Sequence, residues 1–527
     1  MGKFLVYNFS GELDDISHLF PNERLARVAA VLGKGGHEAV IVDRANVADL
    51  LRFGREYLQN LGRMSFRDTN PLYENGLREE AAGIAEGRYD VMFMNLWHGT
   101  GFKFSVDLAA QLRRLRPGMR IYGIGQKVDW FREHILRLTN GSFDGLVTGL
   151  GYNAVAAIAA GRPPADVPNL IARTGDTIAE SRKEVIDVDD YPPPAYGEGV
   201  YLAIRQKAPV YSLTLSNQAC PNACVFCIRP ENYGREVRKR RVENVIAELS
   251  DLRFRRGITH FRVEDSTPPR GALTELAQAI LDSPLRGKVY LSAFSRVDID
   301  RTEDFSRMAQ AGLLSLFFGL ESLDDGMLRG LKKGITYSGI RDTLTKAHAA
   351  GIFTVGCFIF PLPGETQQSR DTTLGRIREL KPVLDSVLAV PAGIQPFTEW
   401  GRRPERYGIR LAEQYIEEGM IYPMRYEVPI EHWRPLPFTY PLMGKPATEV
   451  TFADIAGLLK DFVARIRDEF KMARVPDYYF LTAHLLGKEP TPAAREIVTC
   501  LMQRDYAALG ALFGIAPLAG SGAAGEG

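Results

Sequence analysis

Short apolar runs alternate with segments of helical spacing through the first third of the chain. Apolar runs of strand type lie at residues 3–9, 37–43, 90–97, 120–125 and 143–148. Strands that alternate with helices are typical of βαβ units and a parallel sheet, so we expect a Rossmann-like α/β domain over residues 1–165. Ligands of such sheets bind beyond the carboxyl ends of the strands. In this chain those ends are residues 8–10, 95–99, 125–127 and 148–151.

A second series of strands and helices follows a polar stretch that ends in three consecutive prolines, residues 192–194. Successive prolines break both helix and sheet, so residues 166–200 are expected to form a linker. The strand-like runs of the second series lie at 210–215, 260–263, 288–293, 315–318, 353–360 and 386–390. Six such repeats predict a partial (β/α)6 barrel of TIM type over residues 201–405, with its chemistry at the carboxyl ends of the strands.

The last part of the chain has a looser pattern. Helical stretches predict a mainly helical C-terminal domain over residues 406–518, and the small-residue tail 519–527 is expected to be disordered. A net charge of +1 gives no indication of a nucleic-acid partner. No apolar stretch reaches the length of a membrane span, and the first residues resemble a strand more than a signal peptide. We therefore expect a cytoplasmic protein with no membrane partner.

Three of the five cysteines lie close together in a polar loop directly after a predicted strand. Cys220, Cys224 and Cys227 have the spacing C-x3-C-x2-C. A fully ligated [4Fe–4S] cluster takes four cysteines, so three thiolates would leave one iron open to another ligand. A structural zinc site would need a fourth ligand, and the nearest downstream histidine, His260, lies beyond a helical segment. Inert buried thiols are the other alternative.

This motif, with the aromatic Phe226 before the third cysteine, resembles the signature of the radical S-adenosylmethionine (SAM) superfamily. Further similar segments follow in order at 263–266, 291–298, 318–322 and 358–366, although Pro361 stands where that family usually has glycine. The resemblance implies a cluster held by the three cysteines, which are also the catalytic residues. It implies SAM contacts at Phe226, Glu264, Asp265, Ser292, Arg296, Glu321 and Ile359.

The N-terminal region resembles the cobalamin-binding domain of class B radical SAM enzymes, through its opening βαβ unit at 23–43 and the glycine-containing loop at 144–151. The resemblance implies cobalamin contacts at Asn95, Gly125, Thr148, Gly149 and Gly151. The D-x-H-x-x-G motif that supplies a histidine to cobalt is absent, because His18 follows Asp15 at the wrong spacing. A dinucleotide site and a domain without a ligand are the alternatives, since residues 149–154 also mimic G-x-G-x-x-A.

Taken together, the resemblances imply a cobalamin-dependent radical SAM enzyme that methylates an unactivated carbon of a small-molecule, natural-product or peptide substrate. They imply a 5′-deoxyadenosyl radical, methylcobalamin as methyl donor, and an external electron donor such as flavodoxin or ferredoxin. A cyclase or rearrangement enzyme with the same cofactors is the alternative, and a non-catalytic sensor is a third. Cys357 and Cys500 are expected to be buried and are too few for a second cluster. The substrate and the oligomeric state do not follow from the sequence.

Overall fold

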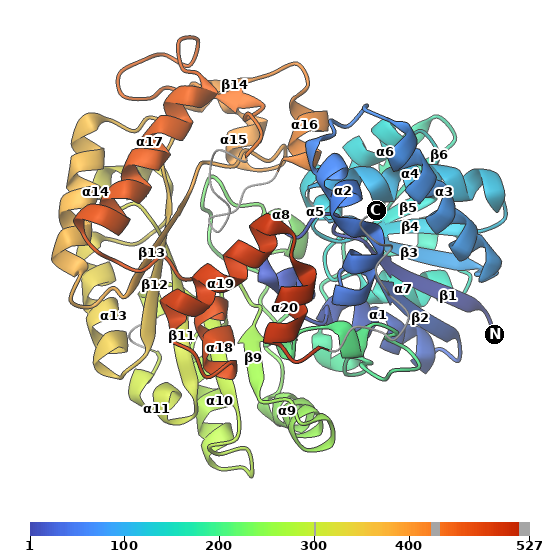
Figure 1. Ribbon diagram of the computed structural model, residues 1–527, viewed down its shortest axis with the longest axis horizontal. Helices are drawn as coiled ribbons and strands as arrows, with labels where there is room; N and C mark the ends of the chain where they lie inside the picture. Colours follow the sequence, from blue (N-terminus) through green and yellow to red (C-terminus); the bar gives the residue numbers. More distant parts are fainter. Residues whose placement is uncertain (98, 300–301, 423–432, 516–527) are drawn as a thin grey trace, which may run out of the picture.

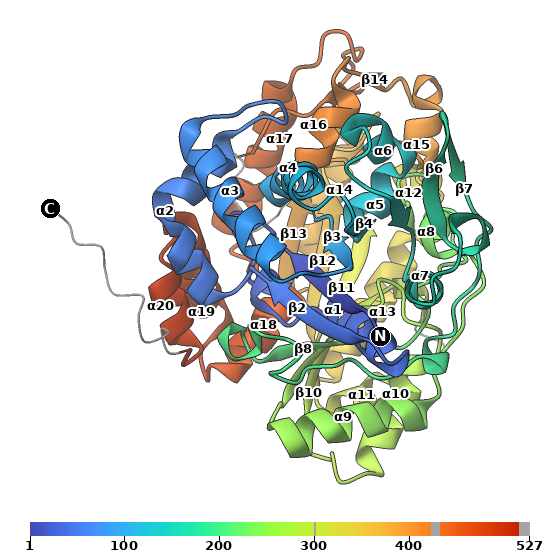
Figure 2. The same ribbon diagram turned by 90° about the vertical axis from the view of Figure 1, so that its right-hand side faces the viewer.

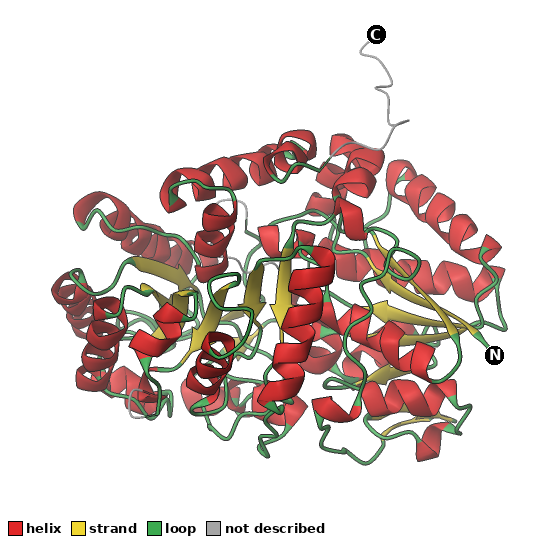
Figure 3. Cartoon of the chain, turned by 90° about the horizontal axis from the view of Figure 1, so that it is seen from below, coloured by secondary structure: helices red, strands yellow, loops and turns green. Residues whose placement is uncertain are grey.

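Two sheets of mainly parallel strands lie side by side in the computed structural model, which describes residues 1–97, 99–299, 302–422 and 433–515 (Figure 1). Helices enclose the strands of both sheets, as the view from below shows (Figure 3). The predicted α/β fold class is therefore confirmed. The tail at 519–527, expected to be disordered, lies outside the described residues.

The N-terminal sheet has seven strands in the order β2-β1-β3-β4-β5-β6-β7. Its parallel strands are β1 (Lys3–Asn8), β2 (Glu38–Asp43), β3 (Val91–Asn95), β4 (Arg120–Ile124) and β5 (Gly145–Val147). Successive side chains of a strand point to opposite faces. Phe4 and Val6 accordingly pack with α1 and α7, whereas Leu5 and Tyr7 belong to the core under α3 and α4.

The helices of this half connect the strands in turn. They are α1 (Glu23–Lys34), α2 (Val47–Arg63), α3 (Pro71–Glu86), α4 (Thr100–Leu115), α5 (Gln126–Phe131), α6 (Glu133–Thr139) and α7 (Tyr152–Ala159). Part of the expected linker 166–200 belongs to the sheet instead. Strands β6 (Leu170–Thr174) and β7 (Thr177–Glu180) pair antiparallel and extend its edge.

The second sheet has six parallel strands in sequential order, β8 to β13, and the two end strands do not pair, so the barrel is open. The strands are β8 (Val210–Leu213), β9 (His260–Val263), β10 (Tyr290–Ser295), β11 (Leu313–Glu321), β12 (Phe353–Ile359) and β13 (Ser386–Val390). The helices around it are α8 (Arg229–Tyr233), α9 (Val242–Arg256), α10 (Ala272–Leu281), α11 (Phe305–Gln310), α12 (Asp325–Gly330), α13 (Tyr337–Ala349) and α14 (Gln367–Leu380). The expected partial barrel is therefore present.

The C-terminal region is mainly helical, as expected, but it packs against both sheets. Its elements are α15 (Glu399–Arg402), β14 (Arg410–Leu411), α16 (Tyr415–Ile421), β15 (Phe438–Thr439), α17 (Phe452–Ala464), α18 (Asp477–Leu485), α19 (Pro490–Gln503) and α20 (Tyr506–Leu512). Helix α18 contacts β9 to β12 on the side away from α10 and α11, and α20 lies beside α2 (Figure 2). These helices therefore share their cores with the two sheets.

Buried charged groups join the two halves of the molecule. The Arg27 guanidinium lies 2.7 Å from the Glu23 carboxylate on α1 and 3.3 Å from the Glu248 carboxylate on α9. The Thr214 hydroxyl, just past β8, donates to Glu23 at 2.6 Å. Because every partner is buried, these contacts fix the orientation of the N-terminal sheet on the barrel. Among the helices that the structure describes, none is both long and apolar enough to cross a membrane.

Candidate active site at the carboxyl ends of the strands

The cysteine loop begins where β8 ends and is fixed by a buried carboxylate. Asp265, just past β9, accepts hydrogen bonds from the Leu215 amide at 2.6 Å and from the Ser216 hydroxyl. Farther along the loop, the Cys220 amide donates to the Gly234 carbonyl at 3.1 Å. Burial raises the pKa of Asp265 to about 6. Both carboxylate oxygens of Asp265 are therefore engaged in holding the loop.

The three thiols have different surroundings. Cys220 is buried and accepts from the Asn222 side-chain amide at 3.4 Å. Cys224 and Cys227 are half-buried and line a cavity of about 300 Å³. Burial raises the pKa of the Cys227 thiol, and Arg229 opposes that effect. The Arg296 guanidinium also interacts with Cys224.

These thiols do not converge on a single point. Among the residues that the structure describes, no three His, Cys, Asp or Glu side chains are close enough to share one metal ion. In a cubane each cysteine binds a different iron, so the thiols around a cluster stand apart. The donor set of three cysteines on one loop therefore fits a [4Fe–4S] cluster better than a mononuclear zinc ion, which needs four converging ligands.

Several residues expected to contact SAM lie beside the cysteine loop. The Phe226 ring lies 5.9 Å from the Trp400 ring, and both belong to the apolar cluster that contains Ile359. Glu321 ends β11 at a register shift with a φ of 64°, and its carboxylate lies 2.7 Å from the Lys333 ammonium group. The structure therefore brings Phe226, Ile359 and Glu321 together at one end of the barrel.

Lys333 is a residue of this group that the sequence analysis missed. Its ammonium group lies 5.7 Å from the centre of the Phe226 ring, and its carbonyl accepts from Arg296 at 2.8 Å. Arg296 also pairs with Asp298 at 2.8 Å. Lys333 lies twelve positions after Glu321, with a helix between them, so only the fold reveals the pair. The possible signal was a run of two lysines after α12 that matches none of the quoted motifs.

Ser292, another residue expected to contact SAM, is bonded to the C-terminal region. Its side chain is fully buried, and its hydroxyl donates at 2.9 Å to Asp477 at the start of α18. Asp477 also forms an ion pair with Arg262 at 3.2 Å. Glu264 is half-buried and lies 3.6 Å from the same Arg262. Helix α18 therefore packs on the side of the strands that Ser292 faces. Its first residue, Asp477, is bonded to polar side chains on β9 and β10.

The residues expected to contact cobalamin lie at the carboxyl edge of the N-terminal sheet. The Asn95 side-chain amide donates to Asn8 at 2.8 Å, and a Cβ atom on Gly125 would lie 2.1 Å from the Asn95 oxygen. The Gly149 amide donates to Asp129 at 2.8 Å. Thr148 and Gly151 flank it, Thr148 bonded to the Asn169 carbonyl and Gly151 with a φ of 68°. Close packing within the sheet edge thus accounts for Gly125 and Gly151, where an added Cβ atom would lie 2.1 Å from a neighbouring side chain.

A cavity of about 290 Å³ lies above the ends of β1 and β3. The strand order reverses between these two strands, and such a switch point is where open α/β sheets bind ligands. The hydroxyl of Ser10 and the indole nitrogen of Trp433 are buried at this cavity and have no hydrogen-bond partner among the described residues. The sequence analysis placed a strand end at residues 8–10 but did not name Ser10. Both groups therefore remain available to hydrogen-bond a ligand at this cavity.

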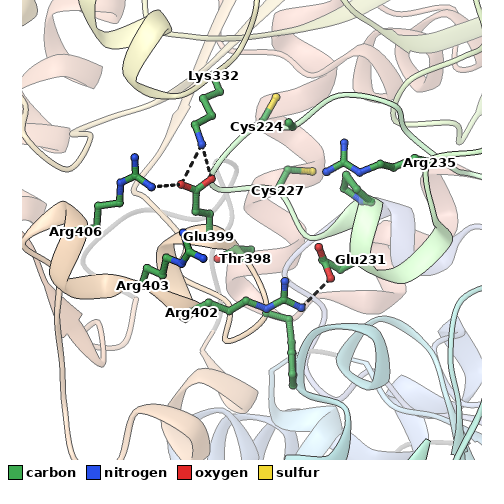
Figure 4. Close-up of a pocket in the computed structure, with 13 residues that line it drawn as sticks. Cys224, Cys227, Glu231, Arg235, Lys332, Thr398, Glu399, Arg402, Arg403 and Arg406 are labelled. Atoms are coloured by element: carbon green, nitrogen blue, oxygen red, sulfur yellow. Dashed lines mark hydrogen bonds and ion pairs between the residues drawn. The ribbon is translucent and has the colours of Figure 1, made fainter.

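The cavity above the cysteines has a strongly basic wall (Figure 4). Its charged lining residues are Arg235, Lys332, Arg402, Arg403, Arg406, Glu231 and Glu399. Phe397 also lines this cavity, and its ring lies 5.7 Å from the ring of His134 on α6. The cavity therefore lies where the barrel meets the N-terminal half of the molecule.

Comparison with known proteins agrees with this arrangement. Residues 215–377 match the Radical SAM superfamily. An uncharacterized methyltransferase of Pyrococcus horikoshii is 28% identical over 204 residues, which are 38% of this chain and 43% of the relative. A putative methylthiotransferase of Methanocaldococcus jannaschii is 27% identical over 306 residues, which are 56% of this chain and 64% of the relative. The chain thus spans less than two thirds of either relative.

Solved structures share the fold over most of this chain. The radical SAM methyltransferase TsrM from Kitasatospora setae, with cobalamin and a [4Fe–4S] cluster bound, has a TM-score of 0.69 at 15% identity, over 97% of this chain and 100% of that chain. The cobalamin-dependent radical SAM enzyme OxsB has a TM-score of 0.57 at 15% identity, over 77% of this chain and 56% of that chain. The chain therefore carries a radical SAM domain within an overall fold shared with cobalamin-dependent radical SAM enzymes.

Proposed function

We propose that this protein is a cobalamin-dependent radical SAM methyltransferase that methylates an unactivated carbon of a small-molecule or natural-product substrate. The observation that carries the proposal is the position of Cys224 and Cys227, which line a cavity where the radical SAM domain meets the N-terminal sheet. The relative named as an uncharacterized methyltransferase and the shared fold of TsrM support it. When bound, the cluster supplies the electron that cleaves SAM, and cobalamin supplies a methyl carrier.

The chain's own residues would hold the cluster and SAM. Cys220, Cys224 and Cys227 would ligate three irons, and Arg296 would stabilise the Cys224 thiolate. Phe226 and Ile359 offer an apolar wall for the adenine ring. The paired Glu321 and Lys333 offer an acceptor and a donor beside that wall, suited to the hydroxyl and carboxylate groups of SAM.

Other residues would exclude water from the reacting groups. Trp400 is buried against Phe226, and Tyr440, also buried, donates to the Pro361 carbonyl at 2.9 Å behind the turn that follows β12. This packing closes the barrel end with aromatic side chains. A closed site protects a radical from side reactions.

The N-terminal half would hold cobalamin between the carboxyl edge of its sheet and the C-terminal region. Asn95, Gly125, Thr148, Gly149 and Gly151 would shape that edge. Ser10 and Trp433 would donate hydrogen bonds to polar groups on the periphery of the cofactor, since both lack another partner among the described residues. We further propose the domain boundaries given by the sequence, with residues 170–180 moved to the N-terminal domain because β6 and β7 extend its sheet.

The test is an anaerobic incubation of reconstituted protein with SAM, a reductant and hydroxocobalamin, followed by mass spectrometry. The proposal expects 5′-deoxyadenosine and S-adenosylhomocysteine, and neither from the Cys220/Cys224/Cys227→Ala variant. Cys500→Ala, which removes a thiol from the buried face of α19, is the matched control and should retain both products. 5′-Deoxyadenosine without S-adenosylhomocysteine would count against methyl transfer. Neither product from protein with an intact cluster would refute the proposal.

A further inference from the structure

The basic wall of the cavity above the cysteines is formed by one short segment. Thr398 caps α15 by accepting from the Gly401 amide at 3.1 Å, and the chain then turns through a 3₁₀ helix, Pro404–Tyr407. This turn places Arg402, Arg403 and Arg406 at the cavity. Figure 4 shows these arginines across the cavity from Cys224 and Cys227.

The two acidic residues of the lining are already paired. The Lys332 ammonium lies 2.8 Å from the Glu399 carboxylate, and Arg406 lies 3.6 Å from it on the other side. Hydrogen bonds from Lys332 and Tyr407 lower the pKa of Glu399, which therefore stays ionised. Glu231 pairs with Arg402 at 2.7 Å. The lining holds five basic residues against these two carboxylates, so an excess of positive charge remains.

Arg403 contributes a positive charge that no neighbouring carboxylate among the described residues compensates. It forms no ion pair with any carboxylate in the described part of the chain, and it lines the cavity. Arg235, the other lining arginine without a carboxylate, donates to the Pro221 and Asn222 carbonyls beside the cysteine loop. Its charge is therefore placed to balance cluster thiolates, whereas Arg403 lies on the opposite wall.

We infer that Arg403, with Arg402 beside it, binds an anionic group of the substrate, a carboxylate, phosphate or phosphonate. The inference rests on the proposed function for the presence of a substrate at this cavity. A guanidinium binds such groups through two parallel hydrogen bonds, so it fixes orientation as well as position. One anchored end would hold the substrate above the cysteines with its other end toward SAM. The arginines line a hollow of about 300 Å³, a size that suits part of a small molecule.

Three other anions have to be distinguished from the substrate. SAM carries a carboxylate, and cobalamin carries a phosphodiester. The proposed SAM residues, Glu321, Lys333 and Arg296, are not among the residues that line this cavity, and the proposed cobalamin cavity above β1 and β3 has a different set of lining residues. An acidic electron-donor protein is the third, because Arg402, Arg403 and Arg406 are exposed, and the flavodoxin measurement below distinguishes it from the substrate.

The experiment measures the binding of radiolabelled inorganic phosphate to reconstituted full-length protein by equilibrium dialysis, with saturating SAM and hydroxocobalamin present. We expect saturable binding that Arg403→Gln weakens about tenfold or more, the loss typical of a charged hydrogen-bonding partner. Arg403→Lys keeps the charge and should recover part of that loss. Arg410→Gln, which alters an exposed arginine on β14 outside the cavity, is the matched control and should bind phosphate as the wild type does.

Formation of 5′-deoxyadenosine from SAM without substrate is measured on the same proteins. It should be unchanged in Arg410→Gln, which alters a residue outside the cavity. Wild-type protein that binds no phosphate, a variant that binds it equally well, or phosphate displaced by SAM or hydroxocobalamin would overturn the inference. So would slower reduction by flavodoxin in Arg403→Gln with phosphate binding intact. Loss of SAM cleavage in the wild type, with Arg403-dependent phosphate binding retained, would instead refute the proposed function.

Discussion

A buried ion pair between Asp43 and Lys207 joins the N-terminal sheet to the segment that leads into the barrel. The Lys207 ammonium lies 2.9 Å from the Asp43 carboxylate, and both side chains are almost completely buried. Lys207 also donates to the His18 and Ala45 carbonyls, at 2.8 and 2.5 Å. Asp43 in turn accepts from the Asn8 side-chain amide at 2.7 Å. All three ammonium hydrogens therefore have acceptors, and the pair anchors the sheet edge.

Breaking this pair from either side should be strongly destabilising. Asp43→Asn leaves the Lys207 charge buried with two neutral carbonyls, which costs about 3–5 kcal/mol. Lys207→Met leaves a carboxylate that still accepts from Asn8, from the Ala45 amide and from the Tyr201 hydroxyl, so we expect the lower end, about 3 kcal/mol. The double variant removes both charges and should recover about 2 kcal/mol relative to the sum of the single changes.

Thermal unfolding and urea titration of the four proteins measure these differences. For a domain of about 150–250 residues, a loss of about 3 kcal/mol in the free energy of unfolding lowers Tm by roughly 6–12 °C. The control is Lys488→Met, which removes an ion pair to Glu496 whose side chains are 39% and 44% exposed, and it should change stability by less than about 1 kcal/mol. Single variants with a Tm within roughly 2 °C of the wild type would refute the reasoning. So would a double variant whose loss in free energy of unfolding equals or exceeds the sum of the losses of the two single variants.

Three further changes test other parts of the structure. Lys333→Ala leaves the Glu321 carboxylate buried without its partner, so SAM affinity should fall about tenfold while the iron content of the reconstituted protein stays constant; unchanged SAM binding in equilibrium dialysis would contradict this. Burial raises the pKa of Glu365 from 4.5 to about 7, so the folded state binds a proton that the unfolded state has already released in this pH range. As pH rises through the range, the free energy of unfolding of the wild type should fall by up to about 3 kcal/mol relative to that of Glu365→Gln, as measured by urea titration. Parallel pH profiles of the two proteins would show that this carboxyl does not titrate as stated. Gly125→Ala places a Cβ atom 2.1 Å from the Asn95 oxygen at a φ of 104°, so it should cost about 2 kcal/mol or more and weaken retention of hydroxocobalamin on gel filtration; a variant with wild-type Tm would remove the packing argument.

The fold followed from the sequence where strands are buried and apolar. The six strands of the barrel are short segments, most of them rich in apolar residues, between helices, and such a pattern depends only on neighbouring residues. Strand β7 has no such pattern, because it lies at the sheet edge with mostly exposed side chains, and residues 170–180 were therefore taken for a linker. Its pairing with β6 is set by the tight turn between them, which an apolar pattern does not reveal.

The candidate site followed from the sequence only where it is local. The cysteine loop and Phe226 lie within one segment, so their spacing indicates their proximity. Ser292 has a partner, Asp477, that lies 185 positions later in the chain, and no local pattern could show that this helix packs against β10. Lys333 joins Glu321 only because β11 ends at a register shift that turns the glutamate toward it. Long-range packing determines the partners of both Ser292 and Lys333, and local periodicity does not encode such packing.

The central claim is that Cys220, Cys224 and Cys227 hold a [4Fe–4S] cluster whose open iron binds SAM. Electron paramagnetic resonance of the dithionite-reduced, reconstituted protein, recorded with and without SAM, tests it most directly. The account predicts a reduced-cluster signal that SAM shifts, that the Cys220/Cys224/Cys227→Ala variant lacks and that Cys357→Ala retains. A signal that does not change when SAM is added, or that is still present in the triple variant, would contradict it.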